Sequence, residues 1–191
     1  MNVILASQSP RRKELMGLFH IPFVIRVSQA DESMDPTLSP AEAVAAVSRR
    51  KAEAIARHAD DVVIAADTIV VLGNEILGKP RDEADASRML HLLSGQSHQV
   101  MTGMTLLRGN AAITTTEITD IHFRKLSDRE IDAYIRTGEP MDKAGSYGIQ
   151  GGAALFADRL VGDYYNVMGL PVCRLGQLLR EIAPEIMEEF Q

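Results

Sequence analysis

The 191-residue sequence predicts an α/β fold, and two patterns indicate it. Short runs of β-branched residues alternate along the chain with stretches that begin at helix caps. The longest run, Val62–Leu72, is apolar around a single carboxylate, Asp67, which is typical of a strand buried on both faces. A buried carboxylate is costly unless it is paired. We therefore expect Asp67 to lie in a polar cleft beside a cation, a metal or hydrogen-bond donors; the alternative is a structural Asp that binds backbone amides at a sheet edge.

The first part of the chain contains two strands and two capped helices. Ser9 is a typical N-cap with Pro at the next position, and Ser39 begins a capping box that ends at Glu42. The predicted elements are strands at Val3–Ala6 and Phe23–Val27 and helices from Pro10 and from Pro40 to about His58.

The rest of the chain also predicts strands and capped helices. We expect a hairpin turn at Leu72–Glu75, a helix capped by Asp82, strands at Val100–Leu107 and Ala111–Phe123, a helix opened by Ser127, a strand at Ala153–Val161, a turn at Gly162–Asn166 and a last helix after Leu170. The glycine-dense stretch Asp142–Gly152 predicts a loop whose backbone can approach a ligand closely, with a flexible linker as the alternative. We find no repeat or interdomain linker, and predict a single domain over residues 1–191.

Composition excludes several classes of protein. The chain is 46% hydrophobic and 24% charged, which is ordinary for a globular domain. A net charge of −6 argues against general binding of polymeric nucleic acid, although a few clustered cations could still bind an anionic small molecule. The single cysteine, Cys173, excludes an internal disulfide, and we expect it to be a small core residue. No run has the length of a membrane span or the form of a signal peptide, so we expect a cytoplasmic protein that binds no membrane.

Several cations occupy positions that suggest a role. Lys51 falls on the apolar stripe of its helix, between Val47 and Ile55, which would direct it inward toward the strand that carries Asp67. The alternative is a lysine whose stem lies on the stripe while its ammonium extends to solvent. Arg11 and Arg12 lie in the first turn of the first helix, where cations are unfavourable unless an anion docks there; two solvated arginines are the alternative.

The motifs that are absent and the charged residues that are present limit the reactions that this protein can catalyse. The sequence lacks a P-loop, a G-x-G-x-x-G turn, an H-E-x-x-H zinc motif and a G-x-S-x-G nucleophile elbow. It retains carboxylates that suit Mg²⁺ or Mn²⁺ and cations that suit a polyphosphate. These residues are Glu32, Asp67, Arg11, Arg12, Lys51 and Lys79, the last held extended by Pro80. Together they favour metal-assisted hydrolysis of a phosphoanhydride.

Six stretches in order along nearly the whole chain resemble the Maf family of nucleoside triphosphate pyrophosphatases: Leu5–Arg12, Ala66–Val70, Gly78–Pro80, Leu93–Gly95, Ala144–Gly151 and Asn166–Pro171. The resemblance implies a Maf/inosine-triphosphatase-like fold, an elongated mixed sheet flanked by helices, with two lobes and a cleft between them, commonly as a homodimer. It also implies cleavage between the α and β phosphates of a nucleoside triphosphate, with Mg²⁺ or Mn²⁺, to give the monophosphate and pyrophosphate.

The resemblance also implies roles for particular residues. Asp67 matches the proton acceptor and Glu32 a metal ligand, with Asp67 as a second candidate ligand. The positions linked to base choice in the dTTP/UTP branch are Arg11, Thr68 and Gln150, and the phosphate-binding positions are Ser7, Arg12, Lys51 and Lys79. A carboxylate beside a cation is a weak base, so Asp67 could instead orient a metal-bound water.

The resemblance to the dTTP/UTP branch implies that the substrates are dTTP and UTP, including modified pyrimidine nucleotides. The Gln150 amide, which offers both a donor and an acceptor, suits a uracil or thymine edge. The alternatives are a purine nucleotide pyrophosphatase of the same fold, and a nucleotide-binding regulator of cell division with little turnover.

Overall fold

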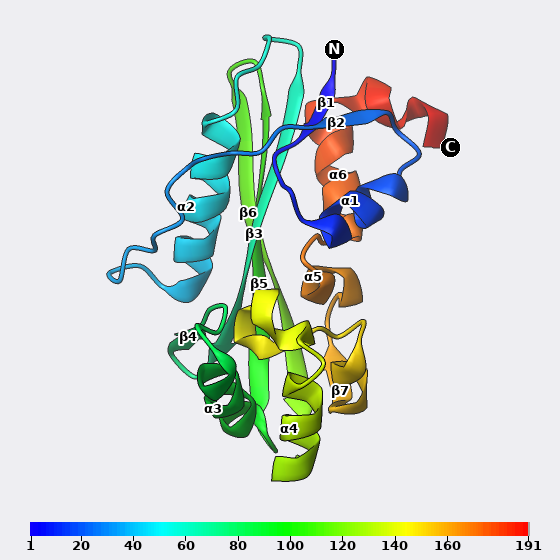
Figure 1. The fold of residues 1–191 in the computed structure, drawn as a ribbon. Coiled ribbons are helices and arrows are strands. Elements are labelled where there is room, and N and C mark those ends of the chain that lie inside the picture. Colours follow the sequence, from blue (N-terminus) through cyan, green and yellow to red (C-terminus); the bar gives the residue numbers. More distant parts are fainter. Residues whose placement is uncertain (191) are drawn as a thin grey trace. The chain divides into compact units, whose positions relative to one another are not determined.

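The computed structural model describes residues 1–190, whose strands form one seven-stranded sheet with helices on its faces (Figure 1). The strands are β1 (Val3–Leu5), β2 (Phe23–Ile25), β3 (Val62–Leu72), β4 (Glu75–Leu77), β5 (Ser97–Arg108), β6 (Ala111–Phe123) and β7 (Ala157–Val161). Their order is β2-β1-β3-β5-β6-β7, and β4 pairs with β3. β1 is parallel to β2 and β3, whereas β4 and β7 are antiparallel to their partners. The predicted α/β class and mixed sheet are confirmed.

The helices are α1 (Pro10–Gly17), α2 (Pro40–Glu53), α3 (Glu83–Leu93), α4 (Asp128–Ile135), α5 (Tyr164–Met168) and α6 (Val172–Ile182), with 3-10 segments η1 (Glu139–Asp142), η2 (Ala144–Ser146), η3 (Gly152–Leu155) and η4 (Pro184–Phe190). The helices α1, α2, α3 and α4 begin at the predicted caps. The Ser9 hydroxyl accepts the Arg12 N–H, Asp82 accepts the Asp85 N–H, and Ser39 and Ser127 each form a complete capping box. Each cap satisfies a backbone N–H that the first turn of a helix leaves unpaired.

The prediction that the second helix continues to about His58 is wrong, because α2 ends at Glu53. Ile55 leaves the helix and packs in a buried cluster with residues that include Ile4 and Val63. The following turn is closed by the carboxylate of Asp61, whose Oδ2 accepts the His58 N–H at 3.0 Å. Burial of Ile55 and this side-chain bond outweigh the helix propensity of the Ala-rich segment.

The segment around the last strand also differs from prediction. Residues Gly152–Leu155 form η3, so the strand starts at Ala157 and not at Ala153. The expected turn at Gly162–Asn166 contains the start of α5, where Asp163 Oδ1 accepts the Tyr165 N–H at 2.7 Å. Cys173 is exposed, which corrects its assignment to the core. It lies two residues before the buried Leu175, and positions two apart on a helix face different directions.

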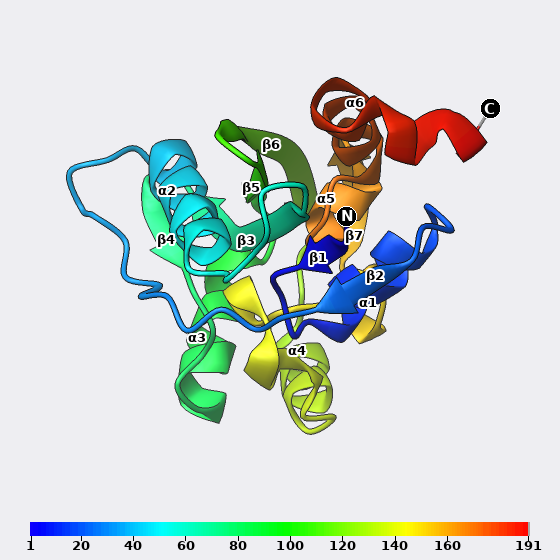
Figure 2. The ribbon, with the colours of Figure 1, turned by 90° about the horizontal axis from the view of Figure 1, so that it is seen from above.

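The chain divides into two compact units. Unit 1 comprises Met1–Asp67, Thr102–Glu117 and the chain from Gly169, and unit 2 comprises Thr68–Met101 and Ile118–Met168. In unit 1, α2 covers one face of the strands, and α1 and α6 cover the other, as both views show (Figures 1 and 2). The core of unit 1 includes a cluster of small and branched residues: Ile4, Ala6, Ala52, Ile55, Val63, Ala65 and Leu107.

Unit 2 has a core of its own. α3 packs against α4 and against η2, and the buried side chains between them include Leu90, Leu93 and Ile131. The ring of Phe123 makes edge contacts with His98, Tyr147 and Phe156 at centroid distances of 4.9, 4.8 and 5.9 Å. Among the described helices, none combines the length and the apolar character that crossing a bilayer requires.

Candidate active site

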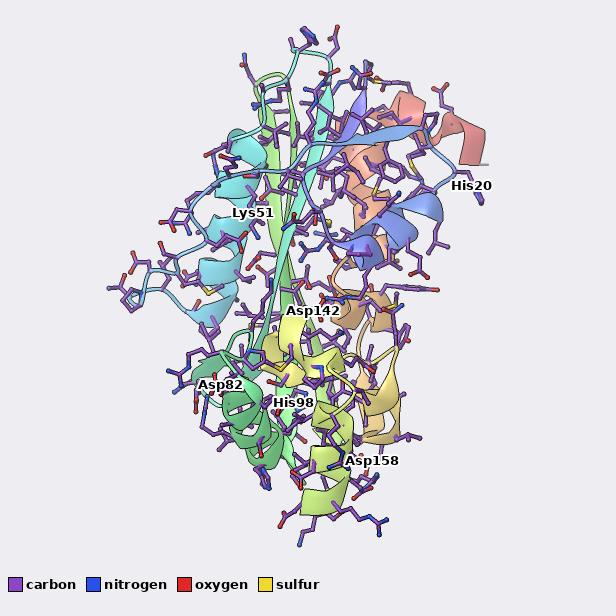
Figure 3. All side chains as sticks on the ribbon, viewed as in Figure 1. His20, Lys51, Asp82, His98, Asp142 and Asp158 are labelled. Carbon is purple, nitrogen blue, oxygen red and sulfur yellow. The ribbon has the colours of Figure 1, made fainter. Side chains whose placement is uncertain are left out.

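Lys51 is the centre of a charged cluster in unit 1. It lies in the last turn of α2 (Figure 3), with 8% of its surface exposed. Its Nζ is 2.7 Å from Oδ1 of Asp67 on β3 and 3.1 Å from Oε1 of Glu32. The predicted inward direction of Lys51 and its pairing with Asp67 are confirmed. The cluster holds two carboxylates on one ammonium and therefore carries a net negative charge.

The three members of this cluster differ in exposure. The side chains of Lys51 and Asp67 are 10% and 13% exposed, whereas that of Glu32 is 64% exposed. The ion pair of Lys51 with Asp67 is thus shielded from water, whereas the one with Glu32 is open to solvent and therefore weaker. Glu32 belongs to the acidic segment Asp31–Asp35 that precedes α2, so a solvent-facing carboxylate lies beside a half-buried one.

Carboxylates of this kind fit a divalent cation. Among the side chains that the structure describes, those of residues 1–188, no three His, Cys, Asp or Glu gather at one point, so these residues alone offer no complete metal cage. Mg²⁺ is often held by one or two carboxylates while water and substrate phosphates supply the other ligands. Glu32 and Asp67, both within 3.1 Å of Lys51 Nζ, form such a pair of hard oxygen donors.

Ser7 and Arg12 form a second polar group in unit 1. The Ser7 hydroxyl is buried and accepts hydrogen bonds from the Ser9 N–H at 3.2 Å and from Arg12 Nη1 at 3.3 Å. Arg12 Nε also donates to the Gly169 carbonyl at 2.8 Å. Burial lowers the pKa of Arg12, and the negative charge of Asp67 opposes this shift. Arg12 is therefore a fixed, partly buried cation, and its interpretation as a solvated surface residue is wrong.

Arg11 lies beside Arg12 in the first turn of α1, and its charge contributes to the lowered pKa of Arg12. Two neighbouring guanidinium groups at a helix N-terminus create a positive field, because the unpaired backbone N–H groups add to it. Such a field suits an anion with several negative oxygens.

Unit 2 holds the other three predicted residues: Thr68, Lys79 and Gln150. Thr68 follows Asp67 in β3 and is half-buried. Lys79 is exposed, with the buried Pro80 after it, and the preceding Gly78 carbonyl accepts the Gly145 N–H at 3.0 Å. Gln150 is exposed on a tight turn that the Gly151 N–H closes onto the Gly148 carbonyl at 3.0 Å.

The glycines of this segment pack against the chain itself, which qualifies the prediction that they serve a ligand. A Cβ atom added to Gly145, whose φ is +67°, would lie 2.8 Å from Val70 Cγ2. One added to Gly151 would lie 2.1 Å from an oxygen of Glu139. The loop is thus folded on its own carboxylate, and Glu139 was not recognised from the sequence. Its only sequence signal was its place in the Gly138–Pro140 turn before the glycine-dense stretch.

His98 and Tyr147 were likewise missed as an interacting pair. His98 is 2% exposed, and its Nε2 lies 2.8 Å from the Tyr147 hydroxyl (His98 is labelled in Figure 3). Burial lowers the pKa of His98 to about 4, and the charge of His122 acts in the same direction. His98 is thus neutral near pH 7, and its Nε2 shares one hydrogen bond with the Tyr147 hydroxyl, whose pKa burial raises.

This pair predicts acid sensitivity. The unfolded chain protonates His98 below about pH 6.5, whereas the folded protein does so only near pH 4, so stability is lost as the pH falls between these values. The loss from this residue is about 3 kcal/mol. Urea unfolding at pH 7 and pH 4.5 should show a smaller decrease for His98→Gln than for the wild type. Equal decreases in both proteins would contradict the assignment.

Comparison with known proteins identifies the family of this chain. The family model described as Maf-like protein matches residues 2–182. A dTTP/UTP pyrophosphatase of Bacillus cytotoxicus is 49% identical over 179 residues, covering 93% of this chain and 94% of the relative. A protein of the same name from Alkaliphilus metalliredigens is 48% identical over 183 residues, covering 94% and 95%.

Solved structures share the fold. A HAM1 protein from Coxiella burnetii superposes with a TM-score of 0.50 at 15% identity, covering 95% of this chain and 99% of that one. The Staphylococcus aureus Ham1 protein gives 0.50 at 12% identity, with coverage of 95% and 98%. Identity this low shows the fold alone, whereas the family model spans nearly the whole sequence. The chain belongs to the Maf family.

Proposed function

We propose that this protein is a nucleoside triphosphate pyrophosphatase that hydrolyses dTTP and UTP, and modified pyrimidine nucleotides related to them, to the monophosphate and pyrophosphate. The observation that carries the proposal is the Lys51 cluster, in which one ammonium is bound by Asp67 and Glu32. The names of relatives at 48–49% identity support the choice of substrates. Nucleoside triphosphates are made and used in the cytoplasm, where we propose that the enzyme acts.

Each residue has a role in this proposal. Arg12, Ser7 and Lys51 bind phosphate oxygens, as does Lys79. Hydrolysis of the α–β bond needs a water molecule whose proton is accepted or whose position is fixed, and Asp67 is the residue assigned to it. Arg11, Thr68 and Gln150 contact the base, and the Gln150 amide can pair with a uracil or thymine edge.

A divalent cation is part of the proposal. Glu32 and Asp67 would hold Mg²⁺ or Mn²⁺, and the bound cation would neutralise charge on the phosphates. When no divalent cation is bound, the Lys51 ammonium would keep the two carboxylates in place and limit the repulsion between them. A homodimer, which the resemblance implies, is checked by measuring the mass of the protein in solution.

The function is tested by incubating the purified protein with each common nucleoside triphosphate and Mg²⁺ or Mn²⁺, and by detecting pyrophosphate directly. We expect fast release from dTTP and UTP, slow release from purine nucleotides, and loss of release after the cation is removed with EDTA. A preference for purine nucleotides would instead support the purine enzyme. Tight nucleotide binding without pyrophosphate would support a regulator with little turnover.

A further inference from the structure

Gln150 sits on a small, closed turn of unit 2. The Gly151 N–H donates to the Gly148 carbonyl at 3.0 Å, so residues 148–151 form a β-turn with Ile149 and Gln150 at its two central positions. Gln150 is exposed, whereas Ile149 is half-buried and packs against the core of unit 2. The direction of the Gln150 side chain therefore depends on what holds the two ends of the turn.

Two side chains outside the turn hold those ends. The Tyr134 hydroxyl, from α4, accepts the Gly148 N–H at 3.0 Å and donates to Glu139 Oε1 at 2.9 Å. The other oxygen of Glu139, Oε2, accepts the Gly152 N–H at 3.0 Å. One hydrogen-bonded pair thus binds a backbone N–H on each side of Gln150. We call Tyr134 and Glu139 the clamp.

The clamp is built to be rigid. Tyr134 is 5% exposed, and its ring packs edge-on against Phe156 at a centroid distance of 5.1 Å. Burial raises the pKa of Tyr134, so its hydroxyl keeps the proton that it donates to Glu139. Gly151 lies so close to the carboxylate that an added Cβ would be 2.1 Å from Oε1, which shows that the turn is moulded on this side chain.

We propose that Tyr134 and Glu139 are positioning residues for base recognition, which hold the turn so that the Gln150 amide meets the edge of a uracil or thymine base. The inference rests on the proposed function, in which Gln150 contacts the base. Neither residue needs to touch the nucleotide. A contact with the base is made equally in the ground state and in the transition state, so its loss raises KM and leaves kcat unchanged.

The test is Tyr134→Phe, which removes the hydroxyl and keeps the ring. Its loss removes two hydrogen bonds of the clamp, and we expect the KM for UTP to rise about fivefold with kcat within about twofold of the wild type. Glu139→Gln keeps one acceptor and should change KM in the same direction by less. Tyr164→Phe is the matched control, because Tyr164 is 42% exposed and lies outside the clamp, and it should leave both constants unchanged.

A double variant separates positioning from a general structural role. In a Gln150→Ala background the amide is already gone, so Tyr134→Phe should cause no further rise in KM. An equal rise in both backgrounds would overturn the proposal, as would an unchanged KM in Tyr134→Phe when Gln150→Ala alone raises it. If Tyr134→Phe does not fold, Glu139→Gln is judged by the same two criteria. A wild-type protein that does not prefer UTP to ATP would instead contradict the proposed function.

Discussion

Asp67→Asn is expected to lower kcat for UTP about 10³-fold, within the range that a positioned general base supplies. The substitution keeps the shape of the side chain and removes its negative charge. Asp67 is 13% exposed and lies 2.7 Å from Lys51 Nζ, so an amide there can neither accept a proton from water nor bind a cation with comparable strength. The rate of pyrophosphate release from UTP with saturating Mg²⁺ measures the effect.

The control is Asp60→Asn, at an exposed position of unit 1 that should keep wild-type activity. A titration with Mn²⁺ distinguishes the two roles of Asp67. If Asp67 holds the metal, high Mn²⁺ recovers part of the rate, whereas a lost proton acceptor is not replaced by added cation. Near-normal turnover and affinity in Asp67→Asn would show that Asp67 is neither the base nor an essential ligand.

Lys51→Met is expected to lower the free energy of unfolding by about 3 kcal/mol, because removing this partner leaves the largely shielded charge of Asp67 without the ammonium 2.7 Å away, while the charge of Arg12 still attracts it. Methionine replaces most of the apolar stem of Lys51 on α2, so the loss reports on charge more than on packing. The contribution of Glu32 is small, since its side chain is 64% exposed. Urea unfolding near pH 7 measures the change.

The double variant Lys51→Met/Asp67→Asn should regain much of this stability, because both charges of the shielded pair are then absent. It should remain inactive. Lys13→Met, at an exposed position of α1, is the control and should change stability by no more than about 0.5 kcal/mol. If the double variant is as unstable as Lys51→Met alone, the ion pair with Asp67 is not the source of the loss.

Local patterns predicted much of this molecule because the forces involved act over a few residues. Caps at Ser9, Ser39 and Ser127 place helix starts correctly, since their hydroxyls bond to N–H groups three residues away. The helical period predicted that Lys51 points inward. Because Asp67 is the single carboxylate of the predicted strand Val62–Leu72, it was the expected partner of Lys51, and the two side chains are hydrogen-bonded. Both inferences needed only spacing and the cost of a buried charge.

Features that depend on distant contacts were not predictable in this way. The contact of Glu32 with Lys51 joins an exposed, acidic segment to a helix, and no period marks it. The end of α2 is decided by Ile55 packing on strand residues far along the chain. The clamp joins Tyr134, Glu139 and Gly148, three positions that share no spacing rule, and it became visible only through the hydrogen bonds themselves.

The close fit of the turn around Glu139 has a consequence for evolution and engineering. Because Gly151 leaves no room for a side chain beside that carboxylate, neither position can change freely while the other stays fixed. In a library that varies residues 148–152 alone, a side chain at position 151 would push the Glu139 carboxylate away from Tyr134 and the Gly152 N–H, so the turn would lose its clamp in those variants. Varying position 139 together with the turn would open combinations that single substitutions cannot reach, so a change of substrate in this lineage is expected to pass through paired replacements.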